Sequence, residues 1–380
     1  MNNLLQTSYN GTRIVRIPAS GAAILPGTSH MYPVRMGLLD RIFQNPSKTL
    51  ERFGFAVVGL GHIAKPFLEQ LQGSSTCRVT AVVSGDPAKV AAARKRFSIE
   101  HSYTYAEFDR LAENPAVDAV YLALPVSMHR EYTERAAAAG KHVLCEKPMA
   151  PSSADAEAMI AACRAAGVRL GIAYRCPHTF AYRSLRDELQ SGAFGSRASL
   201  QIRSGFGFEL KPGWRDDGAL AGGGSMWDVG IYPLNAARFL LGEEPVGVED
   251  ASAVVNANGM EREIRWTSVF PSGARAECVS SYQCEVPDVL RVSGERGSAV
   301  MDPAYRWQKP YKLIGSVATE AFNKTRGLSA RGYNELEFRL EAEELAAAVR
   351  DGRDTICPGE DGLADLRAME AIYRAAGVAM

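Results

Sequence analysis

The chain has 380 residues, 46% hydrophobic and 23% charged, a composition that argues against a disordered, collagenous or coiled-coil protein. Lysine plus arginine equals aspartate plus glutamate at 43 each, so no net field favours nucleic acid as a partner. No uninterrupted apolar run approaches the ~20 residues that cross a bilayer, so we expect neither a membrane helix nor an export signal.

Residues 1–52 form the first predicted region. The first 50 residues contain eight glycines and prolines, which leave room for one short helix around residues 37–43. We interpret the region as an N-terminal arm with little structure. A frayed tail, or a true start at Met31 or Met36, is the simpler explanation, and a strap over a cofactor or a neighbouring subunit is the functional alternative.

Residues 53–173 alternate short apolar runs with helical patterns, which is typical of βαβ units and a parallel sheet. The predicted strands are 55–60, 79–84, 117–124, 142–145 and 168–173, and the predicted helices are 62–72, 87–97, 128–139 and 154–166. The strands are apolar along their length, as expected when helices cover both faces. With right-handed crossovers, the simplest topology is a doubly wound Rossmann sheet, an α/β dinucleotide-binding domain.

Residues 174–380 follow a different pattern. Predicted helices over 181–191 and 225–241 precede alternating segments at 248–257, 261–270, 274–282, 288–293 and 298–301, separated by hairpin-like breaks. One-sided alternation requires helices on one face, so we expect an α+β domain on a mostly antiparallel sheet, closed by helices over 336–350 and 363–375. The open face of such a sheet suits subunit pairing, which predicts a homodimer or homotetramer.

A GxGxxA sequence, Gly59 to Ala64, follows the first predicted strand and opens a helix, which is the context that a dinucleotide fingerprint requires. Gly59 permits the tight turn and Gly61 lets the backbone approach a pyrophosphate, which the helix N-terminus attracts. The small Ala64 allows the helix to pack closely on the strand. We therefore expect the dinucleotide at Gly59, Leu60, Gly61, His62 and Ile63.

The end of the second predicted strand bears on the choice between NAD and NADP. An acidic residue about 20 positions past the loop, which would bind the ribose of NAD, is missing. Ser84 ends the strand, Asp86 stands two residues on, and Lys89 lies on the next helix. A hydroxyl and a cation there favour the 2′-phosphate of NADP. NAD stays the alternative, because Lys89 can be an ordinary solvated residue and Asp86 can turn back to a ribose.

Glu146-Lys147-Pro148 directly follows a strand whose C-terminal end is expected at the ligand edge of the sheet. A lysine ammonium there can bind a substrate hydroxyl and stabilise a developing alkoxide. Pro148 restricts Lys147 to an extended backbone. The alternative is an ordinary surface lysine, which this position disfavours.

A glycine-rich loop over 221–225 runs into a predicted helix that carries Asp228 and Tyr232, four residues apart and so on one face. A carboxylate can orient a phenol and tune its proton affinity, which suits general acid and base work on a carbonyl/alcohol pair. The alternative is a half-buried core tyrosine whose hydroxyl is satisfied by Asp228.

The histidines and cysteines carry weaker signals. The six histidines show no metal-ligand spacing, so we predict no metal. His129, at a helix start after the 117–124 strand, either lines the cofactor cleft or is a structural histidine. The seven cysteines are odd in number and lack a CxxC pair, which is typical of reduced thiols in the cytoplasm. Cys145 has no neighbouring base and is interpreted as a core residue.

Taken together, these motifs resemble the glucose-fructose oxidoreductase, inositol dehydrogenase and MocA (Gfo/Idh/MocA) superfamily over residues 53–378. The resemblance rests on Gly59-Leu60-Gly61, on residues 139–148 ending in Glu146-Lys147-Pro148, on Gly222 to Tyr232, and on Pro358-Gly359-Glu360-Asp361-Gly362. Ser84-Gly85, the tyrosine at 232 where many members carry histidine, and residues 242–245 look most like the glucose-fructose oxidoreductase branch.

The resemblance implies an NADP-dependent sugar oxidoreductase. Lys147 matches the lysine that contacts the substrate hydroxyl and the nicotinamide ribose, and its bond to the following proline is typically cis. Asp228 and Tyr232 match the residues that handle the proton, and Ser84 and Lys89 match contacts to the 2′-phosphate. Further expected cofactor contacts are Leu124, Pro125, His129, Glu146, Arg175, Trp214 and Arg215, and expected sugar contacts are Lys147, Tyr174, Arg175, Asp228 and Tyr232.

Two departures from the family leave alternatives open. Val126 stands where the family usually has asparagine, which removes one polar contact near the cofactor. The arm lacks the export signal of the periplasmic member of the branch, so retention of the cofactor stays undecided. One alternative is an enzyme that exchanges NAD(P) and acts on xylose, an anhydro sugar or an inositol. The other is a non-catalytic NADP-binding sensor, against which Lys147, Asp228 and Tyr232 together weigh.

Overall fold

The computed structural model describes residues 8–9, 12–13, 51–195, 198–205, 221–257, 259–283, 286–306, 313–315 and 336–378. The chain divides into two units, Met1–Leu50 and Glu51–Met380. In the first unit the described part is an antiparallel pair of short strands, β1 (Ser8–Tyr9) and β2 (Thr12–Arg13). The short helix predicted around 37–43 lies outside the described residues. Everything that follows concerns the second unit.

The first sheet of this unit has six described strands, all parallel, in the order β5-β4-β3-β6-β7-β8. Their bounds are β3 (Phe53–Val58), β4 (Cys77–Val83), β5 (His101–Tyr103), β6 (Ala119–Leu122), β7 (His142–Glu146) and β8 (Leu170–Ala173). This order reverses beside β3, as in a doubly wound nucleotide-binding sheet. The predicted Rossmann topology is therefore confirmed.

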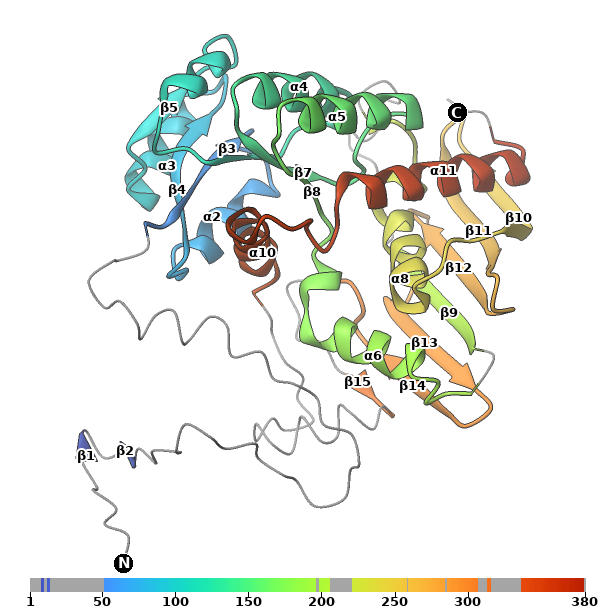
Figure 1. Ribbon diagram of the computed structural model, residues 1–380. Helices are drawn as coiled ribbons and strands as arrows, with labels where there is room; N and C mark the ends of the chain where they lie inside the picture. The colour runs from blue at the N-terminus through green and yellow to red at the C-terminus, as the bar shows by residue number, and fades with distance from the viewer. Residues whose placement is uncertain are drawn as a thin grey trace, which may run out of the picture. The chain divides into compact units, whose positions relative to one another are not determined.

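Helices cover both faces of this sheet (Figure 1). They are α2 (Ala64–Leu71), α3 (Pro87–Phe97), α4 (His129–Ala138) and α5 (Ser153–Ala165), with short 3₁₀ turns η1 (Phe108–Glu113) and η2 (Val126–Met128). Alternate residues of β3 point to opposite faces. Phe55 and Val57 join a core with α2, whereas Ala56 and Val58 join the core under α4 and α5. The continuous apolar run is explained by this double burial.

The second sheet has seven described strands in the order β10-β11-β12-β9-β13-β14-β15. They are β9 (Ala198–Gly205), β10 (Gly247–Val255), β11 (Glu261–Val269), β12 (Arg275–Ser281), β13 (Val289–Gly294), β14 (Gly297–Met301) and β15 (Leu313–Ile314). Only the β9–β12 pair is parallel among them, so the sheet is mixed but mostly antiparallel, as predicted.

Strand β9 is central in this sheet but was not predicted from the sequence. Leu200 and Ile202 are buried, whereas Gln201 and Arg203 on the other face are exposed. No hairpin partner follows β9 directly in the sequence. Its neighbours β12 and β13 begin 70 and 84 residues after its end. Strand β5 was also missed, since all three of its residues are only half-buried.

The second-domain helices are η3 (Cys176–His178), α6 (Phe180–Gln190), a π-helical turn η5 (Met226–Gly230) that continues into α8 (Ile231–Leu241), α10 (Glu337–Asp351) and α11 (Gly359–Ala376). The last two return to the first sheet. Helix α10 packs on α2, with Phe338 and Leu345 in the core there, and α11 packs on both α5 and β10. The predicted boundary between domains at residues 173 and 174 stays a prediction.

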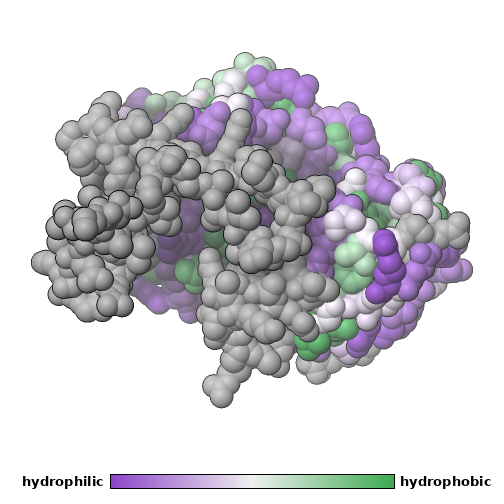
Figure 2. Space-filling model, turned by 60° about the horizontal axis from the view of Figure 1, so that its bottom comes forward, coloured by the Kyte–Doolittle hydropathy of each residue, from purple (hydrophilic) through white to green (hydrophobic). Residues whose placement is uncertain are grey.

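The described surface carries five large exposed apolar side chains: Val246, Val254, Val255, Ile314 and Leu336. On the face seen in Figure 2, small hydrophobic areas are separated by hydrophilic ones. No described helix is both long and apolar enough to cross a membrane. The six described cysteines are buried.

Candidate active site

The turn after β3 has the geometry of a phosphate-binding loop. Gly59 has a φ of +88°, and a Cβ there would lie 2.5 Å from the carbonyl oxygen of Ala123. Its own N–H donates to the Val83 carbonyl at 2.9 Å, which fixes the turn between strands. Gly61 is exposed, with open space where a side chain would stand, ahead of the first turn of α2. The loop therefore fits a dinucleotide pyrophosphate, with Leu60, His62 and Ile63 completing it.

The residues expected at the 2′-phosphate lie together at the end of β4. Asp86 accepts the N–H groups of Ala88 at 3.0 Å and Lys89 at 3.1 Å, and so caps α3. The hydrogen bond from the Lys89 N–H is the main cause that lowers the pKa of Asp86. The buried Ser84 hydroxyl accepts the Asp86 N–H at 3.2 Å. Oδ1 of Asp86 is thus used by the helix cap, whereas Oδ2 lies 3.7 Å from the Lys89 ammonium.

Lys147, Asp228 and Tyr232 come together where the two sheets meet. The Lys147–Pro148 bond is cis, as the family resemblance implied. The Lys147 ammonium donates to the Asp228 backbone carbonyl at 2.5 Å and lies 3.6 Å from its carboxylate. It also lies 4.5 Å from the centre of the Tyr232 ring. The lysine and aspartate side chains are only 9% and 14% exposed, so this group is shielded from bulk water.

The hydrogen-bond partners within this group differ from the predicted ones. The expectation was that Asp228 orients the Tyr232 hydroxyl. Instead, the Tyr232 oxygen accepts a hydrogen bond from Arg175 Nη2 at 2.9 Å, and the Asp228 carboxylate accepts one from the Tyr282 hydroxyl at 2.8 Å. The reason is geometric, since Asp228 stands in the π-helical turn and Tyr232 in the α-helix that follows. Tyr282 was missed because nothing in the local sequence marks it.

Glu261 of β11 holds the glycine-rich loop that leads to Asp228. Its buried carboxylate accepts the N–H of Gly224 at 2.9 Å and that of Met226 at 2.6 Å. Burial raises the pKa of Glu261, against the effect of these two donors. A Cβ on Gly224 would lie 1.8 Å from the Glu261 carbonyl oxygen, and one on Gly223 would lie 1.9 Å from the Trp227 ring. Side chains at either glycine would therefore displace the loop. Glu261 is a further site residue that sequence reasoning missed.

A cleft opens beside these groups at the carboxyl end of the first sheet. Its described lining comprises Leu124, Val126, His129, Lys147, Pro148, Ala221, Gly223, Gly224, Trp227, Asp228 and Tyr282. It thus combines an apolar wall with a lysine, a carboxylate and a phenol, which is the usual make-up of a small-molecule site. The half-buried Pro125 stands between Leu124 and Val126 in the same loop.

His129 is buried, and both of its ring nitrogens face backbone carbonyls. Nε2 lies 3.0 Å from the Leu124 oxygen, and Nδ1 lies 3.0 Å from the Pro148 oxygen. Burial lowers the pKa of His129. His129 thereby joins the loop after β6 to the loop that carries Lys147, and it also lines the cleft, so the structure is consistent with both alternatives.

The remaining predicted residues lie deeper. Glu146 is buried behind Lys147, where it accepts the Tyr121 hydroxyl at 2.5 Å and the Lys147 N–H at 3.3 Å, and burial raises its pKa. Tyr174 is buried near Asp365 and is not among the described residues that line the cleft. Trp214 and Arg215 lie outside the described residues.

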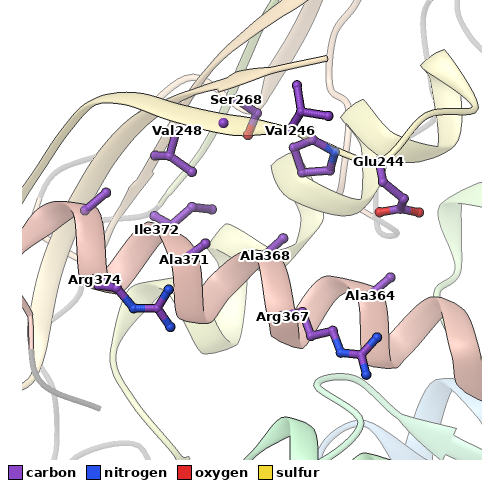
Figure 3. A pocket seen from close by; sticks show the side chains of 13 residues that line it. Glu244, Val246, Val248, Ser268, Ala364, Arg367, Ala368, Ala371, Ile372 and Arg374 are labelled. Atoms are coloured by element: carbon purple, nitrogen blue, oxygen red, sulfur yellow. The ribbon is translucent and has the colours of Figure 1, made fainter. Parts of the chain in front are cut away.

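A second hollow of about 540 Å³ lies between α11 and the start of β10 (Figure 3). Ala364, Ala368 and Ala371 of α11 face Val246 and Val248 across it. Its described lining does not include Lys147, Asp228 or Tyr232. It also contains no group that could serve as a general base beside a proton donor. The cleft, and not this hollow, is therefore the candidate active site among the described residues.

A doubly wound sheet with such a glycine turn, facing a lysine at a strand end, defines a class of protein: the dinucleotide-dependent oxidoreductases. Two family models match this chain, the oxidoreductase family with an NAD-binding Rossmann fold over residues 53–174 and the GFO/IDH/MocA C-terminal domain over residues 182–300. The chain belongs to the Gfo/Idh/MocA family of oxidoreductases, and the resemblance read from its motifs is confirmed at that level.

Individual relatives cover nearly the whole second unit. A D-xylose 1-dehydrogenase [NADP(+)] of Haloarcula marismortui is 31% identical over 89% of this chain and 95% of its own length. A 1,5-anhydro-D-fructose reductase of Ensifer adhaerens is 30% identical over 86% of this chain and 96% of its own. The structure of an aldose-aldose oxidoreductase from Caulobacter crescentus, complexed with glycerol, has a TM-score of 0.78 and 38% identity, covering 86% of this chain and 98% of that one.

Proposed function

We propose that the protein is an NADP-dependent sugar oxidoreductase that interconverts an aldose or ketose with its oxidised or reduced partner, sugar lactones included. One observation carries the proposal: Lys147 and Asp228 line a shielded cleft at the ligand edge of a dinucleotide-binding sheet, and the Tyr232 ring packs against Lys147. The named activities of the xylose dehydrogenase, the anhydrofructose reductase and the aldose-aldose oxidoreductase support a sugar as the substrate class.

The residues of the cleft suit acid and base work on one sugar oxygen. The bound nicotinamide supplies hydride acceptance and donation. Lys147, with a donor to spare beyond its bond to the Asp228 carbonyl, polarises the reacting oxygen and stabilises alkoxide character on it. Tyr232, as its phenolate, takes the hydroxyl proton when the alcohol is oxidised, and as a phenol it returns that proton when the carbonyl is reduced. Asp228 holds Lys147 through its backbone carbonyl and an ion pair, and it holds Tyr282 by accepting that residue's hydroxyl at its carboxylate.

NADP is favoured over NAD by the end of β4. The Asp86 carboxylate is committed to capping α3, whereas the Lys89 side chain is 60% exposed and lies 3.7 Å from that carboxylate. Lys89 can therefore move to a 2′-phosphate beside the Ser84 hydroxyl. The NADP named for the xylose dehydrogenase is consistent with this preference.

Within the family, we assign the chain to the glucose-fructose oxidoreductase branch, in which a retained cofactor cycles between two sugars. The 38% identity with an aldose-aldose oxidoreductase supports this assignment. The alternative is an enzyme that exchanges its cofactor, as the identities with a xylose dehydrogenase and an anhydrofructose reductase would suggest. The cytoplasmic location stays a prediction. A homodimer or homotetramer stays a prediction.

One experiment separates these alternatives. The purified, desalted protein is examined by absorbance at 260 and 340 nm, and glucose and then fructose or another aldose are added without cofactor. A band at 340 nm that rises with one sugar and falls with another supports a retained NADP. A protein that emerges empty and reduces added NADP or NAD with a sugar supports the exchanging enzyme. No turnover with any sugar and either cofactor would contradict the proposed function.

A further inference from the structure

Arg175 was expected to contact the cofactor or the sugar, but its guanidinium is surrounded by protein groups. It follows β8, and the residue is only 3% exposed. One terminal nitrogen donates to the Tyr232 oxygen at 2.9 Å and to the Tyr305 carbonyl at 3.0 Å. The other forms an ion pair with Glu337, the first residue of α10. Neither Arg175 nor Tyr232 is among the described residues that line the cleft, but the Tyr232 ring lies against Lys147, which does line it.

These contacts determine the direction of hydrogen bonding at Tyr232. A guanidinium only donates hydrogen bonds, so the phenolic oxygen must be the acceptor. The phenol's own proton is then directed away from Arg175. The Tyr305 ring stacks on the Tyr232 ring at 5.5 Å with an interplanar angle of 28°, and Arg175 lies 5.1 Å from the Tyr232 ring centre. The tyrosine is thus restrained both at its ring and at its oxygen.

Glu337 transmits the packing of the first domain to this arginine. Helix α10 packs on α2, and Phe338, next to Glu337, lies in the core of the first sheet with Arg175 5.6 Å from its ring centre. Glu341, one turn later, is buried, and neither of its carboxylate oxygens has a hydrogen-bond partner among the described residues. Burial raises the pKa of Glu341 well above its usual range. Glu337, and not Glu341, is therefore the carboxyl group of α10 that bonds Arg175.

We propose that Arg175 and Glu337 act as a positioning pair for Tyr232: Arg175 holds the phenolic oxygen as an acceptor, so that its proton points to the sugar oxygen, and Glu337 holds Arg175. This inference rests on the proposed function, in which Tyr232 moves the proton. It assigns Arg175 no contact with sugar or cofactor. Because Glu337 begins α10, a helix that packs on the dinucleotide-binding domain also helps to position Tyr232 of the second domain.

The test is a double-mutant cycle. Arg175→Met with Glu337→Gln removes both charges together, because removing one alone would leave the other buried without a partner. In the wild-type background we expect kcat to fall by about 10²-fold, the scale of a misplaced reacting group, with KM for the sugar and Kd for NADP little changed. In a Tyr232→Phe background the same pair should change kcat by no more than about twofold.

Glu343→Gln is the matched control, because Glu343 lies on α10 and bonds Ser74 and Arg339 but not Arg175. It should leave kcat unchanged, although it removes a charge from the same helix. Independent losses from the pair and from Tyr232→Phe would overturn the proposal. So would a rise in KM or in Kd for NADP with kcat intact, which would indicate direct binding by Arg175.

A crystal structure of the Arg175→Met/Glu337→Gln variant provides a readout that does not need activity. The proposal predicts that the Tyr232 ring turns or occupies several positions. An unmoved Tyr232 oxygen would refute the positioning pair, whatever the kinetics. If the wild-type protein turns over no sugar, the proposed function fails, and the comparison of the two crystal structures alone decides the role of Arg175 and Glu337.

Discussion

The two sheets that meet at the cleft contribute to it by different physical means. The first sheet supplies backbone geometry at strand ends: the turn at Gly59 and the cis bond after Lys147. The second sheet supplies side chains held by partners distant in sequence, such as Asp228 by Tyr282 and the glycine loop by Glu261. The chemistry of the first side is therefore local in sequence, whereas that of the second depends on tertiary packing.

The largest expected effect is a loss of turnover, and it tests the contribution of the first sheet to the cleft. Lys147→Ala should lower turnover by about 10²-fold or more, because it removes the group that stabilises alkoxide character. Binding of NADP should be nearly unchanged, since the turn at Gly59 is untouched. Steady-state kinetics and a fluorescence titration of NADP measure the two quantities. Unchanged turnover would remove Lys147 from the catalytic group.

The next effect tests the second sheet. Gly224→Ala places a Cβ 1.8 Å from the Glu261 carbonyl oxygen, so the loop must move. We expect a loss of about 2–3 kcal/mol in the free energy of unfolding, in the range of overpacking a buried site. Turnover should fall as well, because Asp228 follows this loop. Chemical denaturation measures the first and an activity assay the second.

Gly247→Ala is the matched control, because the nearest atom to its Cβ would be 3.9 Å away. It should change neither quantity. Equal destabilisation by both substitutions would mean that the second sheet tolerates no added methyl group, and that the loop has no special role.

A smaller effect concerns the cofactor. Lys89→Ala should raise the Kd for NADP by about tenfold, the scale of one charged hydrogen bond, and leave the Kd for NAD unchanged. The exposed Lys95 on the same helix provides the control variant, Lys95→Ala. Calorimetric titration with both cofactors measures the effect. A parallel loss of NAD affinity would show that Lys89 does not read the 2′-phosphate.

The smallest effect is a pH dependence in the second sheet. Burial raises the pKa of Asp288 to about 6, and its Oδ1 has no hydrogen-bond partner among the described residues. A carboxyl whose pKa is higher when folded favours folding at low pH, and this contribution is lost as pH rises from about 4 to about 6. Asp288→Asn should therefore stabilise the protein above pH 6, and not below pH 4.

We expect a gain on the order of 1 kcal/mol, less than the pKa shift alone implies, because asparagine leaves the Arg306 guanidinium, 3.6 Å away, without its carboxylate. Thermal melts of both proteins between pH 4 and pH 8 measure the difference. A gain that does not vary with pH would show that Asp288 stays charged throughout.

The features that depend on local geometry could be predicted from the sequence, and those that depend on distant partners could not. Strand, glycine turn and helix are consecutive at Gly59, and Asp228 and Tyr232 are four residues apart, so their proximity follows from local geometry. Tyr282, Glu261 and Glu337 reach their partners across 54, 37 and 162 residues. No local pattern marks such residues. Arg175 was singled out for its position, but its partners, and so its role, depend on how α10 packs.

The two C-terminal helices, α10 and α11, pack against the strands and helices of the dinucleotide-binding half. Strand β8 is bonded to the segment before α11, through Ile172 N–H to the Cys357 carbonyl at 2.8 Å and a bridge between Gly171 and Pro358. Phe338 and Leu345 of α10 complete the apolar core between the first sheet and α2. During synthesis, the dinucleotide-binding half cannot finish its core until nearly the whole chain has left the ribosome. The two halves must therefore mature together, and a chain truncated before α10 would expose that unfinished core to chaperones and proteases.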